Sequence, residues 1–343
     1  MIKHTPIKFL FIILFSVNIF ADSLSVIAVG DIMMGSTYPE NNLPPNQGKD
    51  LFKNVAPILK QADLTLGNLE GPLTVGGTCT KNVKAGQVYA LRTPPDFVQN
   101  LADAGFDFMN LANNHMNDFG PGGTASTIKA LADVSIEFGG TGGKIGKFEI
   151  AGDKITIVCF AFSPGTNTIL DTKKAQHIVA EQARENDIVI VSFHGGGEGL
   201  NYLHTKDTIE YFLGSPRGNV MKFARAVIDS GADFVWGHGP HVPRAMEIYK
   251  NRLIAYSLGN FCTWGFNIAD ERGYAPILKI VLDSTGAFQK GEIISVRQKL
   301  CQPLEIDAQF NAAKLMKKLS IEDFPNSSPQ ITEQGIILPM KED

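Results

Sequence analysis

The chain has 343 residues, of which 44% are hydrophobic and 19% are charged. This composition is typical of a globular protein and excludes an intrinsically disordered, collagen-like or coiled-coil chain. The 31 basic and 35 acidic side chains give a formal net charge of −4, so we expect no nucleic-acid partner, because such a partner requires a basic surface.

Residues 1–21 differ in character from the rest of the chain. Lys3 and Lys8 precede an apolar run at 9–15, and the segment ends at Ala21. A basic start, a short apolar run and a small residue at the end predict a secretory signal peptide. We therefore expect a periplasmic or secreted protein, whose formal charge becomes −6 once both lysines are removed. The alternative is a protein anchored to the membrane by an uncleaved signal.

After the signal, short apolar or β-branched runs alternate with longer amphipathic runs, which is typical of strands connected by helices. The expected strands cover residues 25–30, 64–68, 107–112, 135–138, 154–162, 187–194, 233–237, 252–258 and 276–283. The expected helices cover residues 50–61, 95–104, 124–131, 175–185, 219–230 and 312–318. No repeat or long linker divides the chain. We therefore predict one α/β domain over 22–300 and a C-terminal extension, 301–343, that packs on the domain or trails from it.

The four cysteines, at positions 79, 159, 262 and 301, could form disulfides in an exported protein. Four cysteines allow three pairings, and the sequence does not choose among them. Cys159 lies inside the apolar strand expected at 154–162, so a buried free thiol is the alternative for this residue.

Polar side chains follow six of the expected strands, at the point where each strand ends. They are Asp31, Asn68, Glu70, Asn113, Asn114, His115, His194, His238, His241 and Asn260. Because the carboxyl ends of strands in an α/β sheet line one crevice, we expect these side chains to converge. Their oxygens and nitrogens are ligands that manganese, zinc and iron accept. The sequence therefore predicts a site for one or two divalent metal ions.

At these residues the sequence resembles the CapA family of bacterial capsule and poly-γ-glutamate synthesis proteins, whose fold is related to that of the calcineurin-like metallophosphoesterases. The resemblance covers about residues 25–261. It rests on Gly30-Asp31-Ile32-Met33, Asn68-Leu69-Glu70, the segment 112–118, the glycine loop after His194, the segment 237–242 with Glu247, and the segment 256–261. It implies an α/β fold that is a four-layer α/β/β/α sandwich, with a metal cleft at the edges of two sheets.

The resemblance also implies roles for individual residues. The metal ligands would be Asp31, Glu70, Asn114, His194, His238 and His241. His115 would donate a proton to the leaving group, and Asp118 would either orient His115 or cap the helix that follows. The sequence departs from the phosphoesterase pattern at two positions, because Met33 replaces a histidine ligand and Asn68 replaces the bridging aspartate. The bridging carboxylate would then come from Glu70 or be absent.

The expected substrate contacts are Asn68, Asn113, Arg217, Arg244 and Asn260, with Arg92 as a further candidate for binding an anion. The resemblance implies an exported metal-dependent hydrolase or transferase that acts on an anionic polymer or a phosphoester in capsule or poly-γ-glutamate metabolism. Its partners would be membrane-bound capsule synthesis or export proteins. The alternative is a component of an envelope export machine that binds the polymer without catalysing a reaction.

Overall fold

The computed structural model describes residues 23–83, 88–266 and 268–340. The strands are β1 (Leu24–Met33), β2 (Leu64–Leu69), β3 (Phe108–Asn110), β4 (Glu137–Gly139), β5 (Gly146–Ile150), β6 (Asp153–Ala161), β7 (Asn167–Thr168), β8 (Ile188–His194), β9 (Glu210–Phe212), β10 (Ser215–Gly218), β11 (Phe234–His238), β12 (Met246–Tyr249), β13 (Arg252–Ala255), β14 (Asn260–Thr263), β15 (Ile277–Leu282), β16 (Phe288–Ile294), β17 (Val296–Arg297), β18 (Glu305–Ile306), β19 (Gln330–Ile331) and β20 (Ile336–Leu338). The α-helices are α1 (Ala56–Leu59), α2 (Val98–Ala104), α3 (Gly120–Asp133), α4 (Thr172–Ala183), α5 (Val220–Ile228) and α6 (Asn311–Asp323). Short 3₁₀ turns cover Pro45–Gly48, Pro95–Phe97, Thr141–Gly143, Leu200–Tyr202 and Asp270–Gly273.

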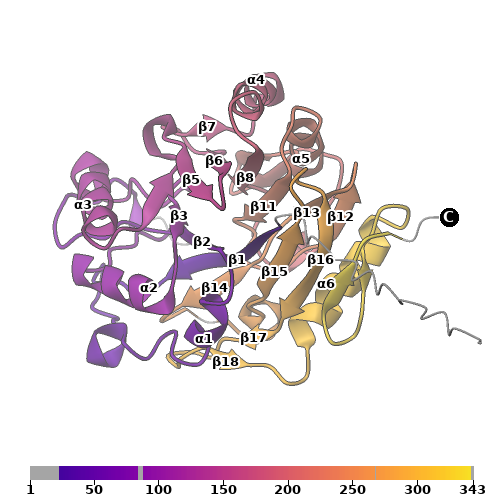
Figure 1. The fold of residues 1–343 in the computed structure, drawn as a ribbon. Coiled ribbons are helices and arrows are strands. Elements are labelled where there is room, and N and C mark those ends of the chain that lie inside the picture. The colour runs from indigo at the N-terminus through magenta and orange to yellow at the C-terminus, as the bar shows by residue number, and fades with distance from the viewer. Residues whose placement is uncertain (1–22, 84–87, 267, 341–343) are drawn as a thin grey trace, which may run out of the picture.

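Most of the strands belong to two large sheets. The first has nine strands in the order β19-β20-β16-β15-β1-β2-β3-β4, with β14 also paired to β1. The second has seven strands in the order β12-β13-β11-β8-β6-β5, with β7 also paired to β6. Figure 1 shows both sheets and the helices around them.

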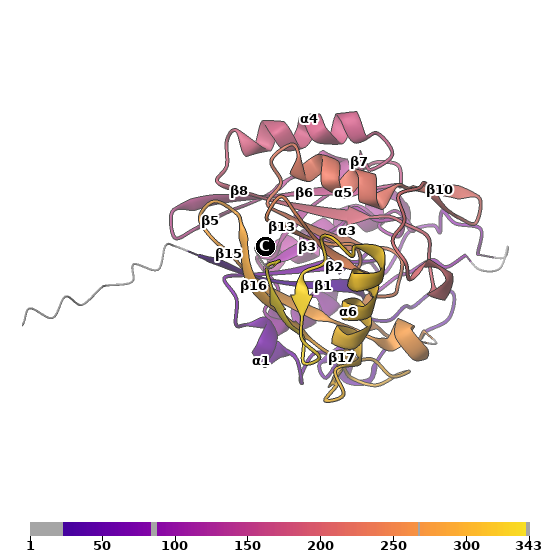
Figure 2. The same cartoon turned by 90° about the vertical axis from the view of Figure 1, so that its right-hand side faces the viewer.

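The apolar core lies in three layers between and outside these sheets. Side chains of both sheets, such as Leu66 and Trp236, share one buried cluster between the sheets. The outer face of the first sheet packs against α2 through Leu101, and that of the second packs against α5 through Phe223. In Figure 2, α4 and α5 lie above β6 and β8, and α1 lies below β1 and β2. The four-layer α/β/β/α sandwich expected from the sequence is confirmed.

The central strands are almost continuously apolar because both of their faces are buried. In β1, Val26 and Ala28 point into the cluster between the sheets, whereas Ile27 and Val29 point toward the outer helices. The side chains alternate with a period of two along a strand, so an uninterrupted apolar run fills two layers of core at once.

The parallel pairing of neighbouring strands brings their polar ends together. Asp31 at the end of β1 pairs in register with Asn68 of β2, which in turn pairs with Asn110 of β3. In the second sheet, His238 at the end of β11 pairs in register with His194 at the end of β8. The sequence expectation that strand ends converge is therefore confirmed for these residues.

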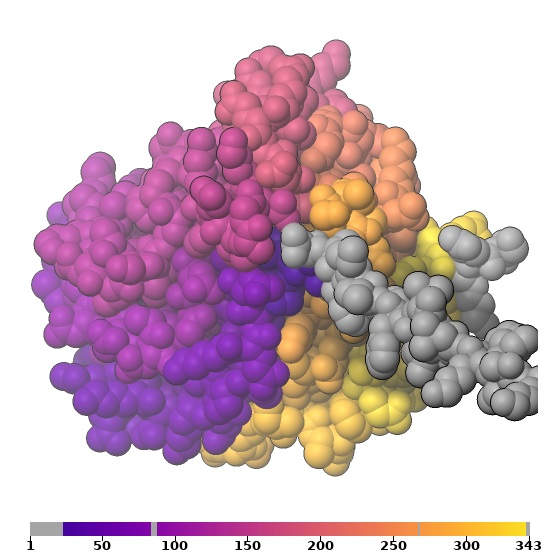
Figure 3. Space-filling model, in the orientation of Figure 1, coloured from indigo at the N-terminus to yellow at the C-terminus, as the bar shows by residue number. Residues whose placement is uncertain are grey.

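The chain after residue 300 packs on the domain. Strands β19 and β20 extend the first sheet beyond β16, and α6 contributes Ala313 and Met316 to the cluster between the sheets. Figure 3 shows the first and second halves of the chain packed against one another on one face of the molecule. Over the described residues, no helix combines the length and the apolar character needed to cross a bilayer.

One predicted helix is wrong for most of its length. Residues 50–61 contain only the short helix α1, preceded by turns, with Pro57 in its first turn. A helix that began at residue 50 would place Pro57 in its interior, where proline removes a backbone hydrogen bond. The prediction at 124–131 is too short, because α3 already begins at Gly120 and has Pro121 in its first turn, where proline is tolerated.

All four cysteines are free thiols in the structure. Cys159 and Cys262 are buried, and burial raises the pKa of both thiols above the ordinary value. A buried thiol with a raised pKa is a poor nucleophile, so these two residues act as small apolar core residues.

Candidate metal centre

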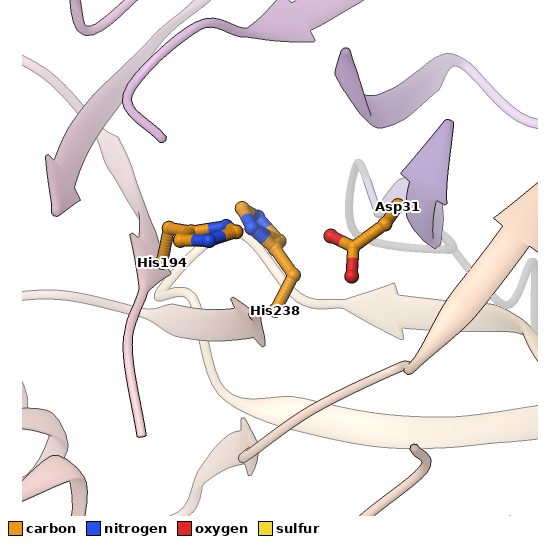
Figure 4. Close-up of side chains that lie close together, drawn as sticks. All are labelled: Asp31, His194 and His238. Carbon is orange, nitrogen blue, oxygen red and sulfur yellow. The ribbon is translucent and has the colours of Figure 1, made fainter. Parts of the chain in front are cut away.

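Two groups of ionisable side chains meet between the carboxyl ends of the two sheets. One group is Asp31, His194 and His238, and the other is Asp31, Glu70 and His241. Within each group the candidate ligand atoms lie within 4.8 Å of one another, and Asp31 belongs to both. Figure 4 shows the ring of His238 between that of His194 and the carboxylate of Asp31. This arrangement places one shared carboxylate between two neighbouring ligand sets.

Asp31 is held by neighbours on both sides of its carboxylate. The Asn68 amide donates to Asp31 Oδ1 at 2.8 Å, and His241 Nδ1 lies 2.9 Å from Oδ2. Burial by itself would raise the pKa of Asp31, but the hydrogen bond and the positive charge of His241 outweigh it and lower this pKa below its ordinary value. Asp31 is therefore an anion inside the protein, which suits a metal ligand.

Asn68 has no free hydrogen-bonding oxygen with which to replace a bridging aspartate. Its Oδ1 accepts hydrogen bonds from Asn110 Nδ2 at 2.9 Å and from Asn113 Nδ2 at 3.1 Å. The Oδ1 of Asn113 in turn accepts from the backbone N–H groups of His115 and Met116. Asn68 and Asn113, which the sequence assigns to the substrate, are instead buried supports that fix the position of Asp31.

Glu70 supplies a second carboxylate to the site. Its Oε1 lies 3.6 Å from His194 Nε2, 3.8 Å from His241 Nε2 and 3.9 Å from His115 Nε2. Both of its oxygens are buried without a hydrogen-bond partner among the described residues. Burial, followed by the nearby charge of Asp31, raises the pKa of Glu70 well above the ordinary value. A buried carboxyl group whose oxygens accept no hydrogen bond is costly to keep as an anion, and a metal cation would offset that cost.

His194 and His238 have ring nitrogens available for coordination. Neither nitrogen of His194 has a hydrogen-bond partner among the described residues, and in His238 only Nε2 has one, Ser192 Oγ at 2.9 Å. Burial lowers the pKa of His194 well below its ordinary value and that of His238 to about 4. Both rings are therefore neutral near pH 7, and neutral imidazole is the form that binds metal.

His241 is positioned by its backbone and by its Nδ1. The backbone φ of His241 is 59°, in the left-handed region. Asn260 contacts His241 twice: its Oδ1 lies 3.1 Å from His241 Nδ1, and its amide donates to the His241 carbonyl. These contacts leave Nε2 directed toward Glu70. Burial lowers the pKa of His241, but the charges of Glu70 and Asp31 outweigh burial and raise it to about 10. A metal at Nε2 must therefore displace a proton.

These residues fit a divalent metal ion. The set combines two carboxylates with three imidazoles, and several of their buried atoms have no protein partner among the described residues. The amide oxygen of Asn114 is also buried and unpaired in the described part of the chain, as expected for a ligand. Oxygen and nitrogen donors of this kind suit manganese, zinc or iron, and the identity of the metal is not fixed by the donors alone.

His115 forms part of a hydrogen-bonded group beside the two ligand sets. Its Nδ1 lies 2.8 Å from Asp118 Oδ2, and Lys81 Nζ lies 2.8 Å from Asp118 Oδ1. Asp118 also accepts from the backbone N–H of Leu91, and the N-terminus of α3 has no side-chain cap. Asp118 therefore orients His115, and the alternative role as a helix cap is wrong. With Nδ1 bound, Nε2 of His115 faces Glu70.

The two arginines that the sequence assigns to the substrate, Arg217 and Arg244, each pair with a glutamate. Arg244 is fully buried and binds Glu210 through two nitrogens, at 2.9 and 2.8 Å. The same guanidinium donates to the carbonyl of Gly197 at 3.1 Å, so it holds the glycine loop that follows His194. Arg217 pairs with Glu198 at 2.8 Å and lies over the ring of Phe162. Arg244 is therefore a support of the loop and is not among the described residues that line the cleft.

Replacing Arg244 with methionine should destabilise the protein by about 3–5 kcal/mol, because it leaves the buried Glu210 carboxylate without its cation. The measurement is urea unfolding followed by circular dichroism. Lys129→Met is the control, since Lys129 forms an exposed ion pair with Asp133 that should contribute about 0.5 kcal/mol or less. Equal effects of the two substitutions would contradict the supporting role of Arg244.

A cavity of about 170 Å³ opens at the metal centre. Its lining includes His115, His241, Asn260, Glu198 and Arg272. Asn260 is the expected substrate contact that the structure does place in this lining. Sequence reasoning missed Glu198, Arg272 and Lys81 as site residues. The place of Glu198 at the end of the glycine loop after a strand was a usable signal. Arg272, in the 3₁₀ turn Asp270–Gly273, and Lys81, in a loop, belong to no recognisable motif.

Comparison with known proteins gives a consistent result. The profile of the family described as "Bacterial capsule synthesis protein PGA_cap" matches residues 25–263. The capsule biosynthesis protein CapA of Bacillus anthracis is 32% identical over 262 residues, which are 70% of this chain and 60% of that protein. The PGA biosynthesis protein CapA of Bacillus subtilis (strain 168) is 32% identical over 258 residues, 70% of this chain and 63% of that protein. The chain thus spans about 60% of the length of these curated relatives.

Among solved structures, the NAD nucleotidase of Haemophilus influenzae is similar with a TM-score of 0.45 and 11% sequence identity. That match covers 87% of this chain and 56% of the nucleotidase.

Proposed function

The chain belongs to the PGA_cap family of bacterial capsule synthesis proteins, and we propose that it is a metal-dependent hydrolase or transferase that acts on an anionic polymer of the cell envelope. The family profile covers residues 25–263, which include every expected metal ligand. The resemblance to the CapA family stated from the motifs is confirmed by this match. Family membership follows from the match, whereas the reaction and the identity of the polymer are what we propose.

The observation that carries the proposal is the pair of ligand sets that share Asp31. Glu70, His194 and His238 contain buried carboxylate and imidazole atoms without partners among the described residues, and such atoms are costly in a folded protein unless something binds them. A divalent ion supplies a Lewis acid that polarises a phosphoryl or acyl oxygen and makes water more acidic. The donor set therefore supports hydrolysis or transfer at a phosphoester or an acyl bond.

His115 is the residue placed to move a proton. Asp118 fixes the ring through Nδ1, so Nε2 is the atom that accepts or delivers the proton beside Glu70. Burial lowers the pKa of His115, which favours the neutral ring near pH 7. A neutral ring with its second nitrogen toward the cleft suits general acid–base chemistry.

Metal analysis tests the proposal directly. The protein, purified without chelator and without a histidine tag, should contain manganese, zinc or iron by mass spectrometry. Dialysis against a chelator should remove the metal, abolish hydrolysis of p-nitrophenyl phosphate or γ-glutamyl p-nitroanilide, and allow recovery on adding metal back. A protein that neither contains nor takes up these ions would refute the metal-dependent reaction.

The second candidate function is polymer binding without catalysis. It is favoured by Met33 in the place of a histidine ligand, and by Asn68, whose amide oxygen is occupied by two amide donors. A weak ligand and an occupied amide leave the metal position beside Met33 and Asn68 with fewer good ligands than the position beside His194 and His238. A metal-free protein that still binds poly-γ-glutamate would identify this function.

We further propose that the protein acts outside the cytoplasm, with membrane-bound capsule synthesis or export proteins as partners. The proposal rests on the signal peptide predicted at residues 1–21, which lie outside the described residues. Expression in a bacterial host should yield a mature chain that begins at Asp22, as measured by intact mass of the secreted or periplasmic protein. Retention of residues 1–21 together with recovery in the membrane fraction would identify an uncleaved anchor instead.

A further inference from the structure

The hairpin of β9 and β10 projects from the body of the molecule beside the metal cleft. In the described part of the chain these two strands pair only with each other, and Figure 2 shows β10 at the right-hand edge, beyond the large sheets. The base of the hairpin is held by the loop after β8, because the backbone N–H of Gly196 donates to the Arg217 carbonyl at 2.9 Å. The Arg217 side chain pairs with Glu198, which lines the metal cleft. The position of the hairpin is therefore fixed relative to the cleft.

Three large apolar side chains of this hairpin lie in solvent. Ile209, Tyr211 and Leu213 are 52%, 54% and 56% exposed. Ile209 and Tyr211 are two residues apart, which places them on the same face of an extended chain, and Leu213 follows at the tip. Glu210, between the first two, is buried and binds Arg244. The usual alternation is therefore reversed in β9, with apolar side chains outward and the carboxylate inward. We call Ile209, Tyr211 and Leu213 the hairpin face.

Leu213 occupies a backbone position that does not suit leucine. Phe212 pairs with Ser215, so the turn of the hairpin consists of Leu213 and Gly214 alone. Their φ angles are 47° and 76°. Such turns favour asparagine or glycine at both positions, and a bulky side chain at positive φ is strained. The strain of Leu213 and its exposure to water are two costs that packing within this chain does not offset, which indicates a contact with something outside the chain.

Exposed lysines surround the hairpin face. Leu170, itself 47% exposed, lies next to Gly218 at the base of β10 and extends the apolar surface toward α4. The lysines are Lys173 and Lys174 in the first turn of α4, Lys206 before β9, and Lys222 in α5. Two aspartates, Asp171 and Asp207, lie in the same segments, so the lysines leave two positive charges in excess. This local charge is opposite in sign to the net charge of the whole chain, −4.

We propose that the hairpin face docks on a lipid bilayer with anionic headgroups. Leucine and isoleucine side chains enter the boundary between headgroups and acyl chains, and tyrosine suits that boundary because its ring is apolar and its hydroxyl polar. Lysines beside such a surface are attracted by anionic headgroups. Docking through the hairpin holds the metal cleft close to the lipid surface. The inference does not depend on the metal-dependent reaction, since none of the residues of the hairpin face belongs to either ligand set.

Co-sedimentation with lipid vesicles tests the proposal. The chain that begins at Asp22, the expected mature form, is used because the apolar run at 9–15 could bind lipid by itself. Vesicles of phosphatidylcholine alone are compared with vesicles of equal parts phosphatidylcholine and phosphatidylglycerol. The protein should bind the anionic vesicles at least about tenfold more tightly than the neutral ones, and the difference should shrink as salt is added.

Leu213→Asn separates lipid binding from folding. Asparagine tolerates positive φ better than leucine does, so the melting temperature should stay the same or rise, whereas binding to anionic vesicles should weaken about tenfold. Leu338→Asn, the same change at an exposed leucine of β20, is the matched control and should leave vesicle binding unchanged. Lys173→Gln combined with Lys174→Gln should weaken binding to anionic vesicles about tenfold and leave binding to neutral vesicles unchanged.

No binding to anionic vesicles, or equal binding by the wild type and Leu213→Asn, would overturn the proposal. Light scattering after size-exclusion chromatography, without vesicles, examines the other occupant of the hairpin face, a second copy of the chain. A wild-type dimer that Leu213→Asn dissociates, in a protein that binds no vesicles, would assign the face to that second copy and refute the contact with lipid.

Discussion

Glu70→Gln should reduce the affinity for manganese or zinc at least about 100-fold. Glu70 Oε1 lies within 3.9 Å of three imidazole nitrogens, and the substitution removes the anionic oxygen from the centre of that group. Loss of a group that merely supports a ligand already costs about 10–100-fold in metal affinity, so loss of a direct ligand should cost at least as much. Burial raises the pKa of Glu70 and so favours its neutral acid in the metal-free protein, which glutamine resembles in shape and charge.

Metal titration by calorimetry measures this effect. Glu149→Gln, at an exposed position on β5, is the control and should leave the affinity unchanged. Met33→His should act in the opposite direction and increase occupancy, because Met33 lines the same cavity as His115 and His241 and histidine is the better ligand. Unchanged affinity in Glu70→Gln would remove Glu70 from the metal centre and favour the polymer-binding function.

The sequence predicted nine strands, which correspond to β1–β4, β6, β8, β11, β13 and β15, and the convergence of their ends, because both depend on local patterns. It missed shorter strands such as β5, β12 and β14. The run 188–191 is apolar, since β8 contributes Ile190 to the layer between the sheets and Val191 to the outer layer. The position of His194 at the end of β8 then follows from the direction of the strand. Fold class, strand order along the chain and most candidate ligands could therefore be inferred without coordinates.

The sequence could not predict which polar groups were already paired with one another. Asn68, Asn113 and Arg244 have the residue types expected of substrate contacts, but their partners come from distant segments, such as Glu210 for Arg244. Only the three-dimensional contacts show that these groups already form hydrogen bonds inside the protein. The same holds for Arg272, which lies in a loop without a motif and reaches the cleft because Asn260 and Asp270 hold it.

The helix predicted at 50–61 failed for a different reason. The apolar residues Leu51, Phe52 and Val55 have helical spacing and are buried, yet they pack against the first sheet from a series of turns. Tertiary packing buries these apolar side chains without a continuous helix. Pro57 in addition restricts where the helix can begin, because proline is tolerated only in a first turn.

His115→Ala should lower turnover about 100- to 10,000-fold while the metal content stays within about twofold of the wild type, because general acid–base catalysis contributes a factor of this size. The geometry explains why turnover should fall while the metal content is retained. His115 belongs to neither ligand set, and its Nε2 lies 3.9 Å from Glu70 Oε1 while Nδ1 is held by Asp118. The measurements are hydrolysis of p-nitrophenyl phosphate or γ-glutamyl p-nitroanilide, and metal content by mass spectrometry.

Asp118→Asn distinguishes a proton-transfer role of His115 from a structural one. The asparagine keeps the size of the side chain but removes the charge that orients the ring and pairs with Lys81, so turnover should fall less than in His115→Ala and its pH dependence should shift. A purely structural pair would lose stability without any change in the pH profile. If His115→Ala loses metal in proportion to activity, His115 is a ligand. The proton would then move through another group, and Glu198, which lines the cleft with its Oε2 3.9 Å from His241 Nε2, is the next candidate.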